Sequence, residues 1–275
     1  MSLCLSAGNL ARAHDLRGVR LRSRLSSLRL GNPRAEGDVH SKLNRVFAAG
    51  LREYAQGRGR TGMTAVAWDD GLLRQAEALC ALAHFCYARG WVPATSGNFS
   101  FRDAGSGRIF VSGSGLDKGL IAPGDLLEID GECRVLAGAG KPSAEASLHG
   151  VIYRERPGTG AILHVHTVWN TLLSEHFARA GAMPIEGYEL LKALDGVKTH
   201  LHRELVPILE NSQEYRGLSM ELMEALRRFQ GAHGVLLRRH GLYTWGKSLA
   251  DARRHLEALE FLFEVEGRRL MGAFK

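Results

Sequence analysis

The pattern of hydrophobic and polar positions becomes regular from Trp68 onward and predicts alternating helices and strands. The segment DDGLLRQAEALCALAHFCYARGW has apolar residues at helical spacing and begins with an aspartate pair. It predicts an amphipathic helix ended by Gly90. The segment SAEASLHGVIYRERPG predicts a second helix, which Ser143 caps and which stops before Pro157. EGYELLKAL predicts a short helix, LSMELMEALRRFQ a longer one, and SLADARRHLEALEFLFEVEGRRLM a long closing helix.

Short apolar segments between these helices predict strands joined by polar turns. TSGNFSFRD and RIFVSGSG predict two strands, and DLLEID and CRVLAG predict a hairpin around Gly131. GAILHVHT, ELVPILEN and the two halves of GVLLRRHGLYTWG predict further strands, with Pro207 near the end of one. Because helices and strands are intermixed and hairpins occur among the strands, we expect an α/β layered domain with a mainly antiparallel or mixed sheet.

The excess of positive over negative charge lies in the first sixty residues of the chain. Residues 1–60 carry a net charge of +8, from eleven arginines and one lysine against four acidic residues. The whole chain has a net charge of +7, so the remaining residues carry −1 and are almost neutral. A nucleic-acid partner is therefore not expected for the body of the protein. Residues 1–62 are expected to be a basic extension without a catalytic role: a disordered tail, an organelle transit peptide, or sequence upstream of a start at Met63. Residues 63–275 are expected to form the folded domain.

Cysteine usage and hydrophobicity limit the class of protein further. The four cysteines are scattered without a Cys-x-x-Cys pair, which favours unpaired thiols in a reducing compartment over a disulfide framework. No apolar run approaches the roughly 18 residues that a membrane-spanning helix needs, so no membrane partner is expected.

The stretch AILHVHTVWN contains the first candidate chemistry, because its two histidines are two residues apart on a predicted strand. Side chains at i and i+2 point to the same face of a strand, so His164 and His166 can hold one ion between their ring nitrogens. His240 ends an apolar strand and precedes Gly241, which would let another backbone approach; it is the candidate third ligand. A second pair with the same spacing, in the segment KTHLHRE, lies among charged residues and is predicted to be a solvated surface.

Five motifs occur in an order and spacing that resemble those of the class II aldolase/adducin family. They are TSGNFSFR, VSGSGLDKG, KPSAEASLHGVIYRERP, AILHVHT and VLLRRHGLYTWG, and the resemblance covers most of the predicted folded chain. The resemblance implies a three-layer α/β/α class II aldolase-like catalytic domain and a homotetramer. It also implies one Zn²⁺ per subunit, held by His164, His166 and His240.

Three segments, EGYELLKAL, VPILENS and RRHGLYTWG, look like those of the family's dehydratases. They imply zinc-dependent dehydration of 5-methylthioribulose 1-phosphate to 2,3-diketo-5-methylthiopentyl 1-phosphate, a cytoplasmic step of methionine salvage. Glu189 matches the acid/base of these dehydratases, and Glu145 matches that of the family's aldolases. We therefore expect Glu189 to be the principal acid/base and Glu145 to be a second carboxylate near the metal. Trp169 and Tyr188 are candidates for contact with the methylthio group.

A sugar phosphate needs a cradle of N–H groups and hydroxyls, and three loops offer one. The SGN and SGSG loops supply an amide, hydroxyls and close backbone approach, and Ser143 begins a helix whose dipole favours an anion. The resemblance places the phosphate on the positions that match Asn98, Ser114, Gly115 and Ser143, with Lys118 nearby as added charge. The family's aldolases often carry a second hydroxyl where this chain has alanine, directly after Ser143, so one phosphate contact is expected to be lost or made differently.

Three other classes of function are consistent with parts of this sequence. A class II sugar-phosphate aldolase or a pentulose-phosphate 4-epimerase would share the fold and the metal ligands, which do not determine the bond that breaks. A non-enzymatic interaction protein of the adducin type would be expected to have lost metal ligands. A nucleic-acid binder would depend on its basic extension, whereas we expect removal of residues 1–62 to leave a folded, active protein.

Overall fold

A nine-stranded sheet organises residues 64–272, the part of the chain that the computed structural model describes. Its strands are β1 (Asn98–Arg102), β2 (Ile109–Ser112), β3 (Leu126–Ile129), β4 (Val135–Ala137), β5 (Ala161–Val165), β6 (Ala182–Glu186), β7 (Arg203–Leu209), β8 (Gly234–Leu237) and β9 (Gly241–Gly246). Their order in the sheet is β4-β3-β2-β1-β5-β9-β8-β7-β6, and only β7 and β8 pair in parallel. The predicted mixed, mainly antiparallel sheet is confirmed. The predicted basic extension lies outside the described residues.

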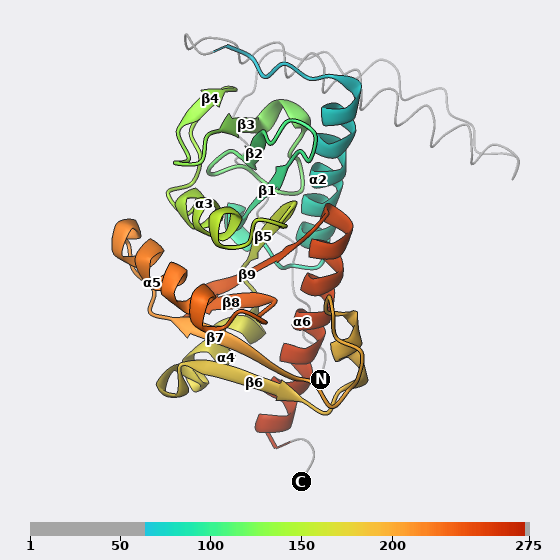
Figure 1. Cartoon of the computed structure of the whole chain (residues 1–275), viewed down its shortest axis with the longest axis vertical. Helices are drawn as coiled ribbons and strands as arrows, with labels where there is room; N and C mark the ends of the chain where they lie inside the picture. Colours follow the sequence, from blue (N-terminus) through green and yellow to red (C-terminus); the bar gives the residue numbers. More distant parts are fainter. Residues whose placement is uncertain (1–63, 273–275) are drawn as a thin grey trace, which may run out of the picture. The chain divides into compact units, whose positions relative to one another are not determined.

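Helices cover both faces of this sheet (Figure 1). On one face lie α2 (Asp70–Ala88) and α6 (Leu249–Leu270), and on the other α3 (Ala146–Glu155) and α5 (Tyr215–Arg228). The other helical segments are α4 (Val168–His176) and the 3₁₀ turns η1 (Pro93–Thr95), η2 (Pro123–Asp125), η3 (Ala178–Ala180) and η4 (Glu189–Ala193). This is the three-layer α/β/α arrangement that the resemblance implied.

The ends of α2 and the start of α3 show how local chemistry sets the helix boundaries. Asp69 caps α2 by accepting hydrogen bonds at 2.8 Å from two N–H groups of its first turn, and Gly90 beyond its end takes a left-handed φ of +70°. The start of α3 is later than predicted, at Ala146, because Ser143 first accepts the N–H of Glu145 in a turn of its own.

Two elements differ from the sequence patterns, which predict neither α4 nor β6. Thr167 caps α4 by accepting the N–H of Asn170 at 3.2 Å, directly after the predicted strand ends. Pro184 lies within β6, which is tolerated because β6 is an edge strand of the sheet. In the predicted hairpin between β3 and β4, the residue with left-handed φ is Cys133, at 63°, and not Gly131.

Alternation along the two central strands decides which face of the sheet each side chain occupies. On β5, Leu163 packs into the core shared with α2 and α6, whereas Ile162 packs into the core shared with α3 and α5. His164 shares the face of Ile162, because residues two apart on a strand point the same way. Asn98 and Ser100 pair with His164 and Ile162 across β1 and β5 and therefore face α3 as well. The fold thus brings polar side chains of two strands to the N-terminal half of α3.

The described residues include three of the four cysteines and all of the helices given above. Cys80, Cys86 and Cys133 are free thiols, and Cys4 lies outside the described residues. None of the helices between residues 64 and 272 combines the length and hydrophobicity needed to cross a membrane.

Candidate metal centre and substrate pocket

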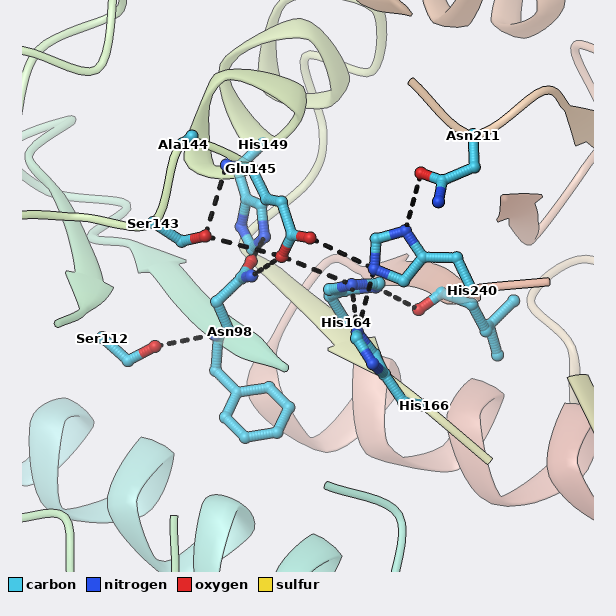
Figure 2. A network of polar contacts seen from close by, with 12 residues as sticks. Asn98, Ser112, Ser143, Ala144, Glu145, His149, His164, His166, Asn211 and His240 are labelled. Atoms are coloured by element: carbon cyan, nitrogen blue, oxygen red, sulfur yellow. Dashed lines mark hydrogen bonds and ion pairs between the residues drawn. The ribbon is translucent and has the colours of Figure 1, made fainter. Parts of the chain in front are cut away.

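Three histidines and one glutamate from different elements meet at one point of the fold (Figure 2). His164 lies in β5, His166 directly after that strand, His240 in the turn between β8 and β9, and Glu145 at the start of α3. Nε2 of His166 is 2.8 Å from Nε2 of His164 and 3.1 Å from Nε2 of His240. Glu145 Oε1 lies 3.1 Å from His240 Nε2, and ligand atoms of all four residues lie within 4.8 Å of one another.

Hydrogen bonds fix the orientation of two of these rings. Nδ1–H of His164 donates to the carbonyl oxygen of Leu242 at 3.0 Å, and Nδ1–H of His240 donates to Oδ1 of Asn211 at 3.1 Å. A neutral ring with its proton on Nδ1 keeps a lone pair on Nε2, the atom that each ring directs into the cluster. Converging lone pairs repel one another unless a cation lies between them, so this geometry fits a metal ion.

The electrostatics of the cluster favour neutral rings at His164 and His166 and an ionised carboxylate at Glu145. Burial, reinforced by the neighbouring histidines, lowers the pKa of His164 well below its usual 6.5, and burial and the charge of His240 lower the pKa of His166 to about 4. For Glu145, burial alone would raise the pKa. The contact with Nε2 of His240 at 3.1 Å and the hydrogen bond from Asn98 outweigh that effect and lower the pKa of Glu145.

The donor set therefore matches a divalent metal ion in both chemistry and geometry. Imidazole nitrogen and carboxylate oxygen are common zinc ligands, and a catalytic zinc usually has three protein ligands with one open position. With zinc–nitrogen distances of about 2.0–2.1 Å, the ligand nitrogens of a tetrahedral site lie roughly 3.3 Å apart. The spacings of 2.8 and 3.1 Å found here are close to that value.

Two glycines allow the chain to come this close to the histidines. A Cβ at Gly241 would lie 2.9 Å from Cε1 of His164 and 3.0 Å from Cδ2 of His166, so any side chain there would displace the ligands. Gly97 has φ +72°, and a Cβ there would lie 2.6 Å from the carbonyl oxygen of His164. The close backbone approach predicted at Gly241 is confirmed.

A pocket of about 620 Å³ opens onto the cluster. The residues that line it include Glu145, His166, Asn211, Tyr215, Arg239 and His240. Neither aromatic candidate for the methylthio group lines this pocket. Trp169 packs against Gly267 of α6, and Tyr188 donates its hydroxyl hydrogen to Glu266 at 2.5 Å.

The structure brings the predicted phosphate loops together beside Glu145. Gly113 forms an isolated bridge with Pro142, and the N–H of Ser114 donates to the carbonyl of Lys141 at 2.9 Å, so the SGSG loop adjoins the segment that ends in Ser143. Ser114 and the next residue, a glycine with φ +70°, are both exposed. These loops can present N–H groups and hydroxyls to an anion.

Two of the predicted phosphate residues are more deeply placed. Asn98 is 2% exposed and has its side-chain amide in use, because Nδ2 donates to Glu145 at 2.8 Å and Oδ1 lies 2.6 Å from Nε2 of His149. Lys118 is 1% exposed, and its Nζ donates to the carbonyls of Thr95 and Leu116. Burial lowers the pKa of Lys118, although the charges of Asp117 and Glu145 oppose that effect.

The structure does not bring Glu189 into the pocket of its own chain. Glu189 begins η4, its side chain is 72% exposed, and it forms an ion pair with Lys192. The hydrogen bond from Lys192 lowers the pKa of this carboxyl. Glu145 is thus the one predicted acid/base residue beside the histidines of the same subunit.

Sequence reasoning did not identify several residues that support the cluster. Asn211 is the last residue of the predicted strand ELVPILEN and orients His240, as described above. The ring of Tyr243 stacks on His164, with centroids 3.9 Å apart and an interplanar angle of 12°. His149 lies four residues after Glu145, and this i, i+4 spacing on a predicted helix is a signal that could have connected the two.

Comparisons with known proteins identify the family and the relatives of this chain. Residues 77–266 match the family described as Class II Aldolase and Adducin N-terminal domain. The methylthioribulose-1-phosphate dehydratase of Methylococcus capsulatus is 48% identical over 194 residues, which are 70% of this chain and 93% of the relative. The enzyme of the same name from Marinobacter nauticus is 42% identical over 191 residues, which are 70% of this chain and 91% of the relative.

The fold also matches solved structures. The l-fuculose-1-phosphate aldolase from Thermus thermophilus superposes with a TM-score of 0.58 at 26% sequence identity, covering 74% of this chain and 98% of that one. A second structure titled L-fuculose 1-phosphate aldolase superposes with a TM-score of 0.61 at 21% identity and covers 72% of this chain and 88% of its own, which supports the fold.

Proposed function

The chain belongs to the class II aldolase and adducin family, and from this premise we propose that it dehydrates 5-methylthioribulose 1-phosphate to 2,3-diketo-5-methylthiopentyl 1-phosphate, a step of methionine salvage. The observation that carries the proposal is the convergence of three imidazoles and a carboxylate in a chain whose relatives are named for this reaction. The protein is then a hydro-lyase. A cytoplasmic location and a homotetrameric assembly are part of the same proposal.

The metal ion that we propose is Zn²⁺, one per subunit. His164, His166 and His240 would hold it, since three imidazoles with an open position are a usual ligand set for catalytic zinc. Bound there, the ion supplies a Lewis acid that stabilises negative charge on the carbonyl oxygen of the substrate.

In the proposed dehydration, a carboxylate transfers the protons. Dehydration requires that a proton leave carbon 3 and that the hydroxyl on carbon 4 depart as water, and the enol that forms becomes the ketone when carbon 4 gains a proton. Glu145 is held ionised beside the histidines, so its carboxylate can accept the proton from carbon 3. The acid formed in this way can return the proton to the departing hydroxyl. One residue can thus serve as both base and acid.

Glu189 can keep its predicted acid/base role only by reaching the pocket of a neighbouring subunit, because in its own chain it is exposed on η4. A hybrid oligomer of His166→Ala and Glu189→Gln subunits tests this possibility. If Glu189 acts across the interface, the two inactive variants should regain activity when mixed, because the intact pocket then receives an intact Glu189. If both variants are inactive and remain so when mixed, Glu189 does not act between subunits. If Glu189→Gln alone is fully active, the residue has no role in proton transfer.

The phosphate of the substrate is proposed to rest on Ser114, Gly115 and Ser143, with Lys118 adding positive charge. Asn98 can contribute at most its second amide N–H, because the first donates to Glu145.

A sugar-phosphate aldolase is the second candidate function. It is favoured by one observation: the carboxylate in the cluster is Glu145, which matches the acid/base position of the aldolases, and not Glu189. The match to an l-fuculose-1-phosphate aldolase is consistent with this alternative but lies at lower identity than the matches to the dehydratases.

The product mass after incubation with 5-methylthioribulose 1-phosphate tests the proposal. We expect a zinc-loaded preparation to yield a product lighter than the substrate by one water. Two smaller fragments would establish the aldolase instead. An unchanged mass with a changed retention time would indicate an epimerase and would contradict the dehydratase.

A further inference from the structure

A continuous chain of hydrogen bonds leads from Glu145 into the core between β1 and α3, and Figure 2 shows its first part, from Glu145 through Asn98 to His149. Nδ2 of Asn98 donates to Oε2 of Glu145 at 2.8 Å, and Oδ1 of Asn98 lies 2.6 Å from Nε2 of His149. Nδ1 of His149 lies 2.7 Å from Oγ of Ser100, which lies 2.8 Å from the hydroxyl of Tyr153. The last four residues are at most 4% exposed. Glu145 is therefore the end of the chain that reaches the pocket.

Matching periodicities of a helix and a strand produce this chain. Glu145, His149 and Tyr153 follow one another at i, i+4 and i+8 on one face of α3, where each step rises about 6 Å. Asn98 and Ser100 are two apart on one face of β1, a step of about 6.6 Å. Because the two steps are nearly equal, strand side chains fit between successive helix side chains, and the contacts alternate from one element to the other.

The protons along this chain can be arranged in one way only once Glu145 is ionised. A carboxylate accepts, so Asn98 turns its amide nitrogen toward Glu145 and its carbonyl oxygen toward His149. Nε2 of His149 must then carry a proton. Burial lowers the pKa of His149 to about 3, although the charge of Glu145 opposes that shift, so the ring is neutral and Nδ1 is an acceptor. Ser100 donates to that nitrogen and accepts from the hydroxyl of Tyr153.

We infer that His149 is a positioning residue, which locks the orientation of the Asn98 amide and thereby the orientation of the Glu145 carboxylate. Without the ring N–H of His149, Oδ1 of Asn98 would lose its hydrogen-bond donor, and the contact with Glu145 alone would hold the amide in place. Burying a polar side chain costs free energy unless all of its hydrogen-bonding groups have partners. An apolar layer could fill the space between β1 and α3 without that cost, so packing alone does not explain these polar residues. The inference rests on the proposed function in one respect, namely that Glu145 moves the proton.

A kinetic comparison of three variants tests the inference through the split between kcat and KM. In His149→Phe we expect kcat to fall by about 10- to 100-fold, the usual cost of removing a group that orients a ligand or catalytic side chain. KM should stay within about threefold and the bound metal per subunit should be unchanged, because His149 is buried, does not line the pocket and makes no hydrogen bond to the ligand histidines. Ser100→Ala should have a smaller effect on kcat, and Tyr153→Phe, at the far end, should change kcat by less than about threefold.

Thermal midpoints of the same variants separate orientation from packing. All three substitutions leave buried polar groups unsatisfied and should lower the midpoint, but kcat should follow the distance of each residue from Glu145 along the chain. A folded His149→Phe protein with kcat within about twofold of the wild type would overturn the inference, as would losses of kcat that parallel only the loss of stability. If His149→Phe does not fold, the comparison of Ser100→Ala with Tyr153→Phe decides by the same criterion.

The ring tautomer of His149 supplies a readout that needs no substrate. In ¹⁵N spectra of the wild type, with His149 assigned from a His149→Gln sample, we expect a proton on Nε2, an unprotonated Nδ1, and no change between pH 5 and 8. A proton on Nδ1, or a charged ring in that range, would overturn the inference. Because this measurement is independent of turnover, a protein that fails to dehydrate 5-methylthioribulose 1-phosphate would refute the proposed function and leave the tautomer result intact.

Discussion

Two pairs of histidines with the same spacing end in opposite settings in this fold. His164 and His166 direct Nε2 atoms into a cluster that a metal ion would fill. In the second pair, Nε2 of His202 lies 2.9 Å from Oε2 of Glu204, which is 1% exposed, while His200 is 54% exposed. The predicted solvated surface is therefore right for His200, whereas His202 is 32% exposed and also hydrogen-bonds to the buried Glu204.

The second pair belongs to a cluster in which a buried carboxylate already occupies the centre. Nδ1 of His233 lies 3.1 Å from Oε2 of Glu204, and its Nε2 lies 2.9 Å from the carbonyl oxygen of Asp195. Because both ring nitrogens face acceptors, both carry protons and the ring is a cation. Burial alone would lower the pKa of His233, but the hydrogen bond and charge of Glu204 outweigh it and raise this pKa above 6.5.

The difference shows that hydrogen bonding decides whether a His-x-His pair can bind a metal ion. The deciding partner is the one bound to the ring nitrogen that points away from the centre of the cluster. At the first site, acceptors hold the outer N–H groups of His164 and His240, and lone pairs converge. At the second, the N–H groups themselves point inward to an anion. The acceptor for His164 is Leu242, which is 78 residues away along the chain, so the short motif alone cannot distinguish the two cases.

The largest expected effect separates the two pairs directly. His166→Ala removes a ligand, so we expect loss of the bound metal and of turnover, whereas His202→Ala should retain both. Metal per subunit by elemental analysis and kcat on 5-methylthioribulose 1-phosphate are the measurements. Full activity of a metal-free His166→Ala protein would remove the basis for distinguishing the pairs.

Replacing Glu145 should impair catalysis without emptying the centre. Glu145→Gln keeps the shape of the side chain but cannot accept a proton, so we expect kcat to fall by roughly 10²- to 10⁴-fold. The three histidines should still bind the metal, which elemental analysis would check. An active Glu145→Gln protein together with an inactive Glu189→Gln protein would reverse the assignment of the acid/base.

The second cluster should matter for stability and not for catalysis. Glu204→Gln leaves the His233 cation without its buried counter-charge, and we expect the free energy of unfolding to fall by roughly 3 kcal/mol. Urea unfolding measures this change, with Glu186→Gln as a matched control because Glu186 pairs with Arg203 on the surface. A loss of bound metal in Glu204→Gln would show that the two clusters are not separate.

The smallest predicted effect is a pH dependence carried by the second cluster. The contribution of His233 is fully present below its unfolded pKa of 6.5 and is lost as the pH rises through its higher folded pKa. Burial alone would raise the pKa of Glu204, but the hydrogen bond and charge of His233 outweigh it and lower it below 4.5, so its contribution is lost as the pH falls through that lower value.

The difference in unfolding free energy between wild type and His233→Gln should therefore be greatest between about pH 4.5 and 6.5 and shrink on either side. Both proteins are compared metal-free, so that metal binding does not add its own pH dependence. A difference that grows steadily above pH 6.5 would contradict the charge assigned to His233.

Much of the fold follows from local patterns. The helix capped by Asp69, the hairpin of β3 and β4 and the long closing helix all have strong periodicity and clear end signals, and all are confirmed. The helix α4 was missed because its cap, Thr167, comes directly after the histidine strand, where no polar break separates the two elements. The strand β6 was missed because Pro184 weakens its strand pattern.

The candidate site was less predictable than the fold. The three histidines could be named because strand periodicity and the family motifs point to the same residues. The position of Glu189 could not be predicted, because a 3₁₀ turn of five residues is too short for its pattern to show the face on which it packs. The Asn211 contact depends on which loops meet at the turn between β8 and β9, and that is a property of the tertiary fold.

An anomalous diffraction map, collected at the zinc absorption edge from crystals grown with one equivalent of Zn²⁺, tests the central distinction most directly. We expect one anomalous peak per subunit, about 2.0–2.1 Å from Nε2 of His164, His166 and His240, and none beside Glu204. A peak between Glu204 and His202, or no peak at the three histidines, would contradict it.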